Sequence, residues 1–296
     1  MSDGGDDGAN RPVRPPWSEF RAALDAAGFR PSKRLGQNFL LDDNMARAIA
    51  ADAGVEPGRF VLEVGPGCGF LSVHLAHAGA RLLAVEIDPR LAPIARRFLE
   101  PYPSAEVIEC DVLASKSSLA AEVAARLPAA GPWTLCANLP YSISGPFLAT
   151  IALLDRPPAR VCCLVQGEVA ERLAASPGDP AWGPLSAVFQ ESFDVALGRP
   201  VPPGLFWPRP GVDSRVFVAD VRKGLAEPDL RRRRAAFYRE LMRARRKSLR
   251  RVLSDLDGGA RATEALAALE LDPMRRAETL SLDELRSLEA SRAKGL

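Results

Sequence analysis

The fold is decided by the stretch FVLEVGPGCG, residues 60–69, which leads into an apolar helical pattern. Its first five residues are typical of a buried strand, and three glycines within five positions then form a tight turn that opens the helix. Missing side chains at such a turn let a ligand approach the backbone. The G-x-G-x-G spacing departs from the dinucleotide fingerprint, and Pro66 removes one backbone donor for a pyrophosphate. A strand-to-helix turn without a ligand is the alternative interpretation.

Around this stretch, short apolar runs alternate with helical patterns from about residue 40 to residue 165. Strands are expected at Phe60 to Val64, Arg81 to Glu86, Glu106 to Glu109, Trp133 to Ala137 and Arg160 to Val165. Helices are expected between them, at Phe70 to Ala78, Pro89 to Leu99, Leu119 to Leu127 and Pro146 to Leu154. Strands this apolar are usually buried on both faces of a mainly parallel sheet with helical crossovers. The sequence therefore predicts an α/β fold with a doubly wound, Rossmann-like sheet.

The rest of the chain divides by composition. Helices near 168–174 and 185–193 and a strand at 216–221 are expected to extend the sheet. From Pro228 the chain becomes basic and helical, with helices expected at Leu230 to Leu256, Thr263 to Leu269 and Leu282 to Arg292. We therefore expect a disordered tail at 1–16, a sheet domain at 17–222 that begins with a short helix, and a smaller C-terminal helical domain at 228–296.

Composition excludes several classes of protein. With 47% hydrophobic residues, the 296-residue chain can bury a core. Five cysteines without a C-x-x-C pair argue against a zinc site and a disulfide framework. The first sixteen residues are unlike a secretory signal, and no apolar run reaches the about eighteen residues of a membrane span. We expect a cytoplasmic protein without metal or membrane; the residues carry no signal of oligomeric state.

Two acidic residues follow the next strands and fit a cofactor that contains adenosine. Glu86 ends the second strand, 21 positions beyond Gly65, where a carboxylate can accept both hydroxyls of a ribose. Asp111 ends the third strand and can accept a hydrogen bond from an adenine amino group. A helix N-cap is the alternative role of Asp111 and the preferred role of Asp88.

The most specific motif is Asn138-Leu139-Pro140-Tyr141, which follows the fourth strand at the edge where α/β folds bind ligands. An adenine amino nitrogen is a poor nucleophile because its lone pair is delocalised into the ring. The side-chain oxygen of Asn138 and a backbone carbonyl near Leu139 or Pro140 can accept its two N–H bonds and aim the lone pair at a methyl donor. Tyr141 can stack on the base. A sulfonium methyl needs only positioning, so the motif indicates methyl transfer from S-adenosylmethionine.

A base must leave its stack to enter such a pocket, which favours a second aromatic wall. Phe206, within Leu205-Phe206-Trp207-Pro208, is the candidate. Stacking on an aromatic side chain is worth roughly 1–3 kcal/mol per base. Core packing is the alternative role of this ring.

A basic stretch lies between Arg222 and Arg251, with thirteen Lys or Arg against three acids. Most charge runs are solvated helix faces. One this dense beside a base pocket predicts a phosphate-binding surface, to which Lys33 and Arg34 can add.

These residues together make the sequence resemble the ribosomal RNA adenine dimethyltransferases, which act on two adjacent adenosines near the 3′ end of small-subunit ribosomal RNA. The resemblance covers about residues 30 to 255. It rests on the ordered motifs KRLGQNFL (33–40), EVGPGCG (63–69), NLPYSIS (138–144), VQGEVAERL (165–173), FWPRPGVDS (206–214) and RKSLR (246–250).

The resemblance implies a role for each site residue. The set that it places at the cofactor S-adenosylmethionine is Asn38, Leu40, Gly65, Glu86, Asp111 and Asn138. The set that it places at the target base is Asn138, Leu139, Pro140, Tyr141 and Phe206. Gly65 would lie beside the amino-acid portion of the cofactor. The implied partner is small-subunit ribosomal RNA, either naked or in a pre-ribosomal particle.

Four residues depart from the family pattern. Ser142, Gly145, Gly167 and Pro184 stand where asparagine, threonine, lysine and arginine are usual. They leave the residues for methyl transfer intact and concern RNA contacts and the number of methyls added.

Three other functions fit parts of the sequence. A large-subunit ribosomal RNA methyltransferase of the antibiotic-resistance type shares the glycine loop and an Asn-x-Pro-Tyr group, but Leu139 and the long helical region favour the small-subunit group. A non-catalytic ribosome-assembly factor would keep the fold, and intact Glu86, Asp111 and Asn138 argue against it. A nicotinamide dehydrogenase is disfavoured by the glycine spacing.

Overall fold

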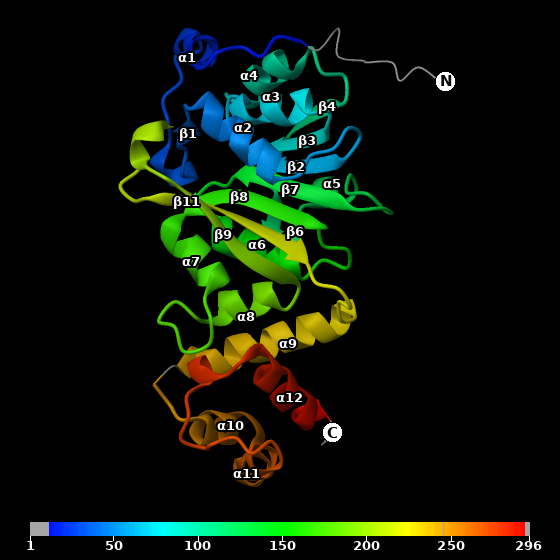
Figure 1. Cartoon of the computed structure of the whole chain (residues 1–296), viewed down its shortest axis with the longest axis vertical. Coiled ribbons are helices and arrows are strands. Elements are labelled where there is room, and N and C mark those ends of the chain that lie inside the picture. Colours follow the sequence, from blue (N-terminus) through cyan, green and yellow to red (C-terminus); the bar gives the residue numbers. More distant parts are fainter. Residues whose placement is uncertain (1–11, 245, 294–296) are drawn as a thin grey trace, which may run out of the picture. The chain divides into compact units, whose positions relative to one another are not determined.

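The computed structural model describes residues 12–244 and 246–293, and it contains one large sheet (Figure 1). Seven strands lie in the order β4-β3-β2-β7-β8-β11-β9. Their bounds are β2 (Phe60–Val64), β3 (Arg81–Glu86), β4 (Ala105–Glu109), β7 (Trp133–Asn138), β8 (Arg160–Gln166), β9 (Phe193–Val201) and β11 (Ser214–Val221). The pairs β2·β3, β2·β7, β3·β4 and β7·β8 are all parallel. The predicted α/β fold with a Rossmann-like sheet is confirmed.

Helices follow the first strands, as the alternating pattern predicts. They are α2 (Asp43–Asp52), α3 (Phe70–His77), α4 (Ala92–Leu99), α5 (Ala121–Ala124) and α6 (Ser144–Ala152). At the start of α2, Asp42 Oδ1 accepts a hydrogen bond from Met45 N at 2.7 Å. The α5 region is shorter than the predicted Leu119 to Leu127, because β5 (Leu113–Ser115) pairs with β6 (Ser118–Leu119) just before it.

Further short elements lie before β2 and between β8 and β11 in the chain. They are α1 (Trp17–Ala26), η2 (Lys33–Leu35), β1 (Phe39–Leu40), α7 (Gly167–Ala174), α8 (Pro184–Gln190), η3 (Pro203–Leu205) and β10 (Phe206–Trp207). β1 and β10 pair as an antiparallel ribbon, with Leu40 opposite Phe206. The predicted first helix is confirmed as α1, which packs Phe20 on Phe98 with ring centroids 3.9 Å apart. Of the predicted disordered tail at 1–16, residues 1–11 lie outside the described residues. The prediction was wrong for residues 12–16, which are described and in which Arg14 Nη1 donates to Asp43 Oδ1 at 2.9 Å.

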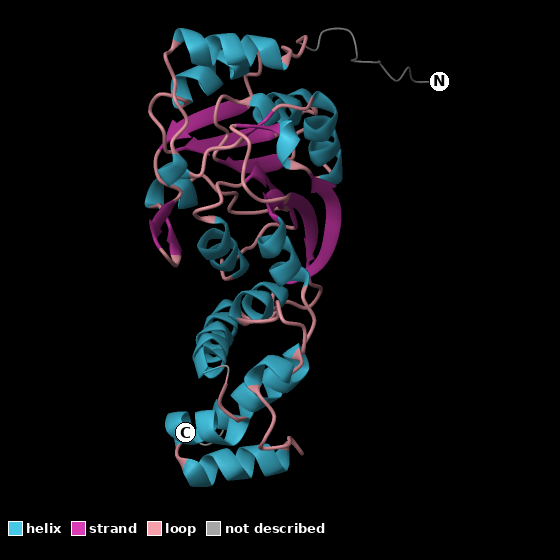
Figure 2. Cartoon of the chain, turned by 90° about the vertical axis from the view of Figure 1, so that its left-hand side faces the viewer, coloured by secondary structure: helices cyan, strands magenta, loops and turns pink. Residues whose placement is uncertain are grey.

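Beyond β11, the described residues contain only helices and loops (Figure 2). The elements are α9 (Pro228–Leu241), η4 (Met242–Ala244), α10 (Leu249–Asp257), α11 (Gly259–Ala268), η5 (Ala277–Thr279) and α12 (Leu282–Ala293). The single helix expected from Leu230 to Leu256 is therefore interrupted. The reason is visible at the start of α10, where Leu249 N donates to Arg275 O at 2.8 Å and Arg250 N donates to Pro273 O at 3.1 Å.

The chain forms two compact units. The sheet unit comprises residues up to Ser144 together with Pro158–Gly167 and Gly198–Val218; the helical unit comprises Gly145–Pro157, Glu168–Leu197 and Ala219–Leu296. Helices α6 to α8 thus group with the C-terminal helices, whereas the sequence suggested a linear division between 222 and 228. The helical unit has its own core, which includes Trp182, Tyr238 and Leu249. None of the described helices combines the length and apolar character needed to cross a membrane.

Candidate active site

A cavity of the sheet unit gathers most of the predicted site residues. Its lining comes from residues 35–40, 63–68, 85–87, 110–112 and 138–143, with Phe70, Leu71 and Leu91. The predicted cofactor residues that line it are Asn38, Leu40, Gly65, Glu86, Asp111 and Asn138. Leu139, Pro140 and Tyr141 line it as well. Parallel strands end at one edge of a sheet, so residues far apart in the chain meet there.

The glycine loop is shaped by the packing of the chain itself. Gly65 and Gly67 have φ values of 69° and 60°, which favour glycine. A Cβ atom on Gly65 would lie 2.7 Å from Pro140 Cγ, and one on Gly67 would lie 2.7 Å from the Phe39 ring. The space left by the missing side chains is therefore filled by Pro140 and by the Phe39 ring.

Glu86 is 3% exposed, and both of its carboxylate oxygens accept backbone hydrogen bonds. Gly67 N donates to Oε2 at 2.8 Å, and Asp88 N donates to Oε1 at 2.8 Å. Burial raises the pKa of Glu86 to about 7. Each oxygen keeps a second lone pair for a ribose hydroxyl.

Glu63 is a second buried carboxylate that the sequence analysis did not assign. It is 1% exposed, and neither its Oε2 atom nor the nearby Ser72 hydroxyl makes a hydrogen bond of normal geometry among the described residues. Burial raises the pKa of Glu63 to about 8, and the Ser72 hydroxyl opposes this rise. A signal was present in the sequence, because an acid stands at the fourth position of an otherwise apolar strand. A buried acceptor without a partner is costly unless a ligand satisfies it.

The charge of the lining is one-sided. Among the described residues that line the cavity, Glu63, Glu86 and Asp111 are the charged side chains, and none is Lys, Arg or His. S-adenosylmethionine carries a sulfonium and an ammonium group, so its charge complements this lining. A pyrophosphate would add negative charge instead. The three acidic side chains of the lining therefore fit S-adenosylmethionine. No group of three or more metal-ligating side chains occurs among the residues that the structure describes.

The two aspartates near the cavity have different roles. Asp111 Oδ1 accepts a hydrogen bond from Leu113 N at 2.9 Å in the turn before β5, so the N-cap alternative for Asp111 is wrong. Asp88 makes the hydrogen bonds expected of a cap at the turn that leads into α4, because its Oδ1 accepts from Arg90 N at 3.0 Å and its carbonyl accepts from Ala92 N at 3.1 Å, although the regular helix begins only at Ala92. Asp88 Oδ2 also accepts a hydrogen bond from Gln37 Nε2 at 2.9 Å, which fastens the N-terminal segment to the end of β3.

The side chain of Asn138 is oriented by the N-terminal segment. Its Nδ2 donates to the backbone carbonyl of Asn38 at 2.9 Å, which leaves the side-chain oxygen as an acceptor. The carbonyl of Pro140 already accepts two hydrogen bonds, from Ile143 N at 3.1 Å and Ser144 Oγ at 3.0 Å. Of the two backbone carbonyls that the sequence suggested, that of Leu139 is therefore the better acceptor for a target amine.

Phe206 differs from its predicted position. Its ring is 3% exposed, belongs to the core of the sheet unit and does not line the cavity. Pairing of β10 with β1 places Phe206 opposite Leu40, which is also buried in this core. In this conformation the ring has the alternative role, core packing, and does not form a wall of the cavity.

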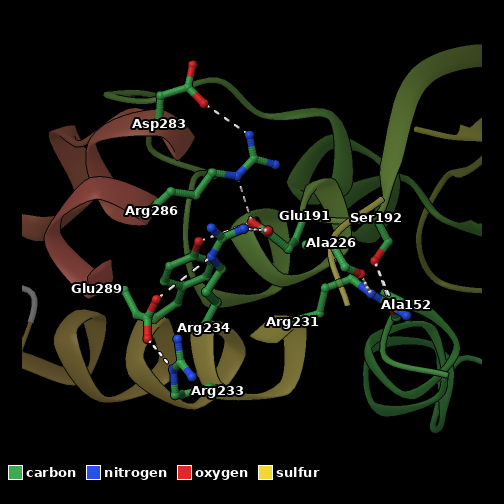
Figure 3. Close-up of polar contacts among 11 residues, drawn as sticks. Ala152, Glu191, Ser192, Ala226, Arg231, Arg233, Arg234, Asp283, Arg286 and Glu289 are labelled. Atoms are coloured by element: carbon green, nitrogen blue, oxygen red, sulfur yellow. Dashed lines mark hydrogen bonds and ion pairs between the residues drawn. The ribbon is translucent and has the colours of Figure 1, made fainter. Parts of the chain in front are cut away.

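Two of the first arginines of α9, Arg231 and Arg234, are held inside the helical unit. Arg231 is fully buried and donates to the carbonyl of Ala152 at 2.7 Å (Figure 3). It also donates to the carbonyl of Leu154 at 2.7 Å. Arg234 Nη1 lies 2.6 Å from Glu191 Oε1, and that 3%-exposed carboxylate also accepts a bond from Arg286 Nε at 3.1 Å. The sequence prediction of a phosphate-binding role was wrong for Arg231 and Arg234, because their partners come from distant parts of the helical unit.

The later part of the stretch is different. Arg243, Arg246, Lys247, Arg250 and Arg251 are exposed, and we call them the 243–251 patch. Lys247 and Arg251 contact Asp255 at 3.0 and 3.4 Å. For Arg243, Arg246 and Arg250 the described residues supply no ion-pair partner. The charge available to an external partner therefore lies around η4 and the start of α10.

Comparison with known proteins places the chain in one family. Residues 28–293 match the model of the family described as ribosomal RNA adenine dimethylase. A relative from Geobacter metallireducens, named ribosomal RNA small subunit methyltransferase A, is 41% identical over 274 residues, which is 88% of this chain and 95% of the relative. A relative of the same name from Deinococcus radiodurans is 40% identical and covers 93% of this chain and 90% of its own.

Solved structures agree on the fold. The 23S rRNA methyltransferase ErmE matches with a TM-score of 0.64 and 25% identity, over 86% of this chain and 99% of that one. A dimethyladenosine transferase from Plasmodium falciparum matches with a TM-score of 0.69 and 22% identity, over 84% and 95% of the two chains. With a family model that spans nearly the whole chain and relatives at about two-fifths identity, the protein belongs to the ribosomal RNA adenine dimethylase family.

Proposed function

We propose that the protein transfers methyl groups from S-adenosylmethionine to the N6 amino groups of two adjacent adenosines near the 3′ end of small-subunit ribosomal RNA. The observation that carries the proposal is the position of Asn138, whose side-chain oxygen is left as an acceptor at a cavity lined by acids and by no basic side chain among its described residues. Family membership and the names of the relatives support the substrate. The partner is small-subunit RNA or a pre-ribosomal particle in the cytoplasm.

The cavity residues account for binding of the cofactor. Glu86 accepts the ribose hydroxyls with its remaining lone pairs, and Asp111 accepts the adenine amino group. Glu63 balances the positive charge of the ligand with its unpartnered Oε2. The remaining contacts to the cofactor are made by lining residues that complement its shape, Asn38, Leu40 and Gly65. When bound, the cofactor supplies a methyl group that is already activated for displacement.

The motif after β7 prepares the nucleophile. The Asn138 side-chain oxygen and the Leu139 carbonyl accept the two N–H bonds of the target amine, and Tyr141 stacks on the base. This arrangement aims the nitrogen lone pair at the methyl group and stabilises the positive charge that develops on nitrogen. After transfer, the nitrogen loses one proton to water. Phe206 can contribute a second wall only after it leaves its packed position.

The 243–251 patch supplies the contacts to RNA phosphates. Its arginines stand apart from the buried ion pairs of α9, so their charge is available to a partner. Arginine binds phosphate through a planar pair of donors.

A large-subunit substrate is the second candidate. It is favoured by one observation, the similarity to ErmE at 25% identity. Relatives named small subunit methyltransferase are closer, at 35–41% identity. We therefore keep the small-subunit substrate as the proposal.

Replacement of Asn138 tests the proposal directly. Asn138→Ala should abolish methyl transfer, because the amine loses the acceptor that orients it. Affinity for S-adenosylmethionine, measured by calorimetry, should fall by no more than about tenfold, the value of one hydrogen bond. Asn44→Ala, an exposed asparagine of α2, is the matched control and should leave turnover unchanged. Substantial turnover by Asn138→Ala would remove this residue from the chemistry.

A further inference from the structure

Tyr141 is held from two sides. The hydroxyls of Tyr141 and Ser214 share a hydrogen bond at 2.5 Å. On the backbone side, Gly36 passes so close that a Cβ atom there would lie 3.1 Å from Tyr141 N. Both ends of the tyrosine are therefore constrained before any base is present.

Ser214 is itself a fixed point. It is 1% exposed and is the first residue of β11 in the large sheet. The residue before it, Asp213, accepts a backbone hydrogen bond from Gly167 N at 2.9 Å, just after β8. All these residues belong to the sheet unit. The Ser214 hydroxyl is thus held in a fixed position by the large sheet, within hydrogen-bond distance of the Tyr141 hydroxyl.

The hydroxyl of Tyr141 has no task in the proposed chemistry. Stacking uses the face of the ring, and burial raises the pKa of the phenol above its usual range, so it stays protonated. A tyrosine that rotated freely would lose rotamer freedom each time a base stacked on it. A ring that is already oriented avoids this cost at the moment of binding.

We infer that Ser214 is a positioning residue, which holds the Tyr141 ring in the plane in which the target adenine stacks. The inference rests on the proposed function. It assigns a role to a serine that lies 73 residues from Tyr141 in the chain.

A double-mutant cycle tests this role. Ser214→Ala and Tyr141→Phe each remove the same hydrogen bond, and each should lower kcat/KM for RNA by about five- to tenfold, the effect of one hydrogen bond. The double variant should be no worse than either single variant, because the bond can be lost only once. Most of the loss should fall on kcat, since a misaligned base still binds. Affinity for S-adenosylmethionine should stay within twofold of that of the wild type.

Ser104→Ala is the matched control. Ser104 Oγ donates to Ala80 O at 3.1 Å in the same unit, away from the cavity, so its loss should leave kcat/KM unchanged. Thermal unfolding separates misfolding from mispositioning, and Tyr141→Phe serves alone if Ser214→Ala does not fold. Effects of the two single variants that multiply in the double variant would overturn the inference, as would full activity of Ser214→Ala. Wild-type protein that methylates no RNA would instead contradict the proposed function.

Discussion

Buried carboxylates have arginine partners in the helical unit and none in the cavity of the sheet unit, among the described residues. In the helical unit, Glu191 is 3% exposed and contacts Arg234 and Arg286 at 2.6 and 3.1 Å. In the sheet unit, Glu63 and Glu86 are equally buried, but the described residues around their cavity include no cation. A buried carboxylate with cationic partners belongs to the internal structure of the unit, whereas one without such partners is suited to a cationic ligand. The presence or absence of a cationic partner therefore distinguishes a structural carboxylate from one that is a candidate for ligand binding.

The basic residues show the same division. Arg231, Arg232, Arg233 and Arg234 of α9 contact carboxylates or carbonyls of their own unit, while the 243–251 patch keeps its charge exposed. In the sequence both parts belong to one basic stretch. Charge density alone thus does not identify a surface for RNA, because some of the cations already have partners inside the protein.

The largest effect should follow from removing the compensated carboxylate. Glu191→Gln removes the buried carboxylate that pairs with the part-buried Arg234 and Arg286, which keep only Glu289 at 3.9 Å and the exposed Asp283 at 3.0 Å. It should lower the free energy of unfolding by up to about 3–5 kcal/mol. Urea unfolding followed by circular dichroism measures this. A loss below about 1 kcal/mol, as for an exposed pair, would show that the buried network does not hold the helical unit together.

Neutralising the patch should affect RNA and leave stability alone. The triple variant Arg243→Gln, Arg246→Gln, Arg250→Gln should weaken RNA binding, and it should reduce the slope of log affinity against log salt by about 0.7–0.9 per lost phosphate contact. Filter binding over a salt series measures the slope. The matched control is the triple variant Arg96→Gln, Arg97→Gln, Arg156→Gln, which removes the same charge elsewhere. An equal loss of slope in the control would mean that the patch has no special role.

The uncompensated carboxylates should make cofactor binding depend on pH. Burial raises the pKa of Glu63 to about 8 and that of Glu86 to about 7, and a cationic ligand favours the ionised forms. Affinity for S-adenosylmethionine should therefore rise between pH 6 and pH 8, by up to about tenfold per pH unit for each titrating group. Glu63→Gln should flatten this dependence. Calorimetry at several pH values provides the measurement, and an affinity independent of pH in the wild type would contradict it.

The same burial affects the ligand-free protein. The pKa of Glu63 is about 8 in the folded protein and 4.5 for an ordinary glutamate, so the folded protein binds this proton more tightly than the unfolded chain. The protonated Glu63 therefore contributes to stability fully below pH 4.5, and this contribution is lost as pH rises to about 8. Glu63→Gln should therefore make unfolding less dependent on pH in this window. Thermal melts without ligand test this, and identical pH profiles for wild type and variant would contradict the assignment.

The smallest effect should come from an exposed ion pair of α9. Arg232 contacts Asp155 at 2.6 Å, with the aspartate side chain 72% exposed. Asp155→Asn should change stability by no more than about 1 kcal/mol. Comparison with Glu191→Gln in the same urea assay then isolates burial as the cause. Similar losses in the two variants would break the distinction between the buried and exposed arginines.

The sequence predicted the parts of the fold that have strong local signals. The strands β2 and β3 have the predicted bounds, because continuous apolar runs flanked by turns admit few other structures. The strand β9 was missed. It is an edge strand, mostly exposed, and contains Gly198 and Pro200, so it lacks both the apolar run and the strand propensity.

The candidate site was predictable where a motif ends a strand. Asn138 and Glu86 lie at the cavity because chain order and sheet order together place strand ends side by side. Burial of Phe206 was not predictable, since it depends on the pairing of two short strands far apart in the chain. The partners of Arg231 and Arg234 were hidden for the same reason, because helix periodicity does not say which distant residues a face will meet.

Identification of the methylated nucleoside tests the central claim most directly. The purified protein is incubated with labelled S-adenosylmethionine and with undermethylated small subunits, large subunits or free RNA, and the RNA is then digested and separated. The account predicts labelled N6,N6-dimethyladenosine from small-subunit RNA, at two adjacent adenosines. Label confined to large subunits, or no label despite cofactor binding, would contradict it.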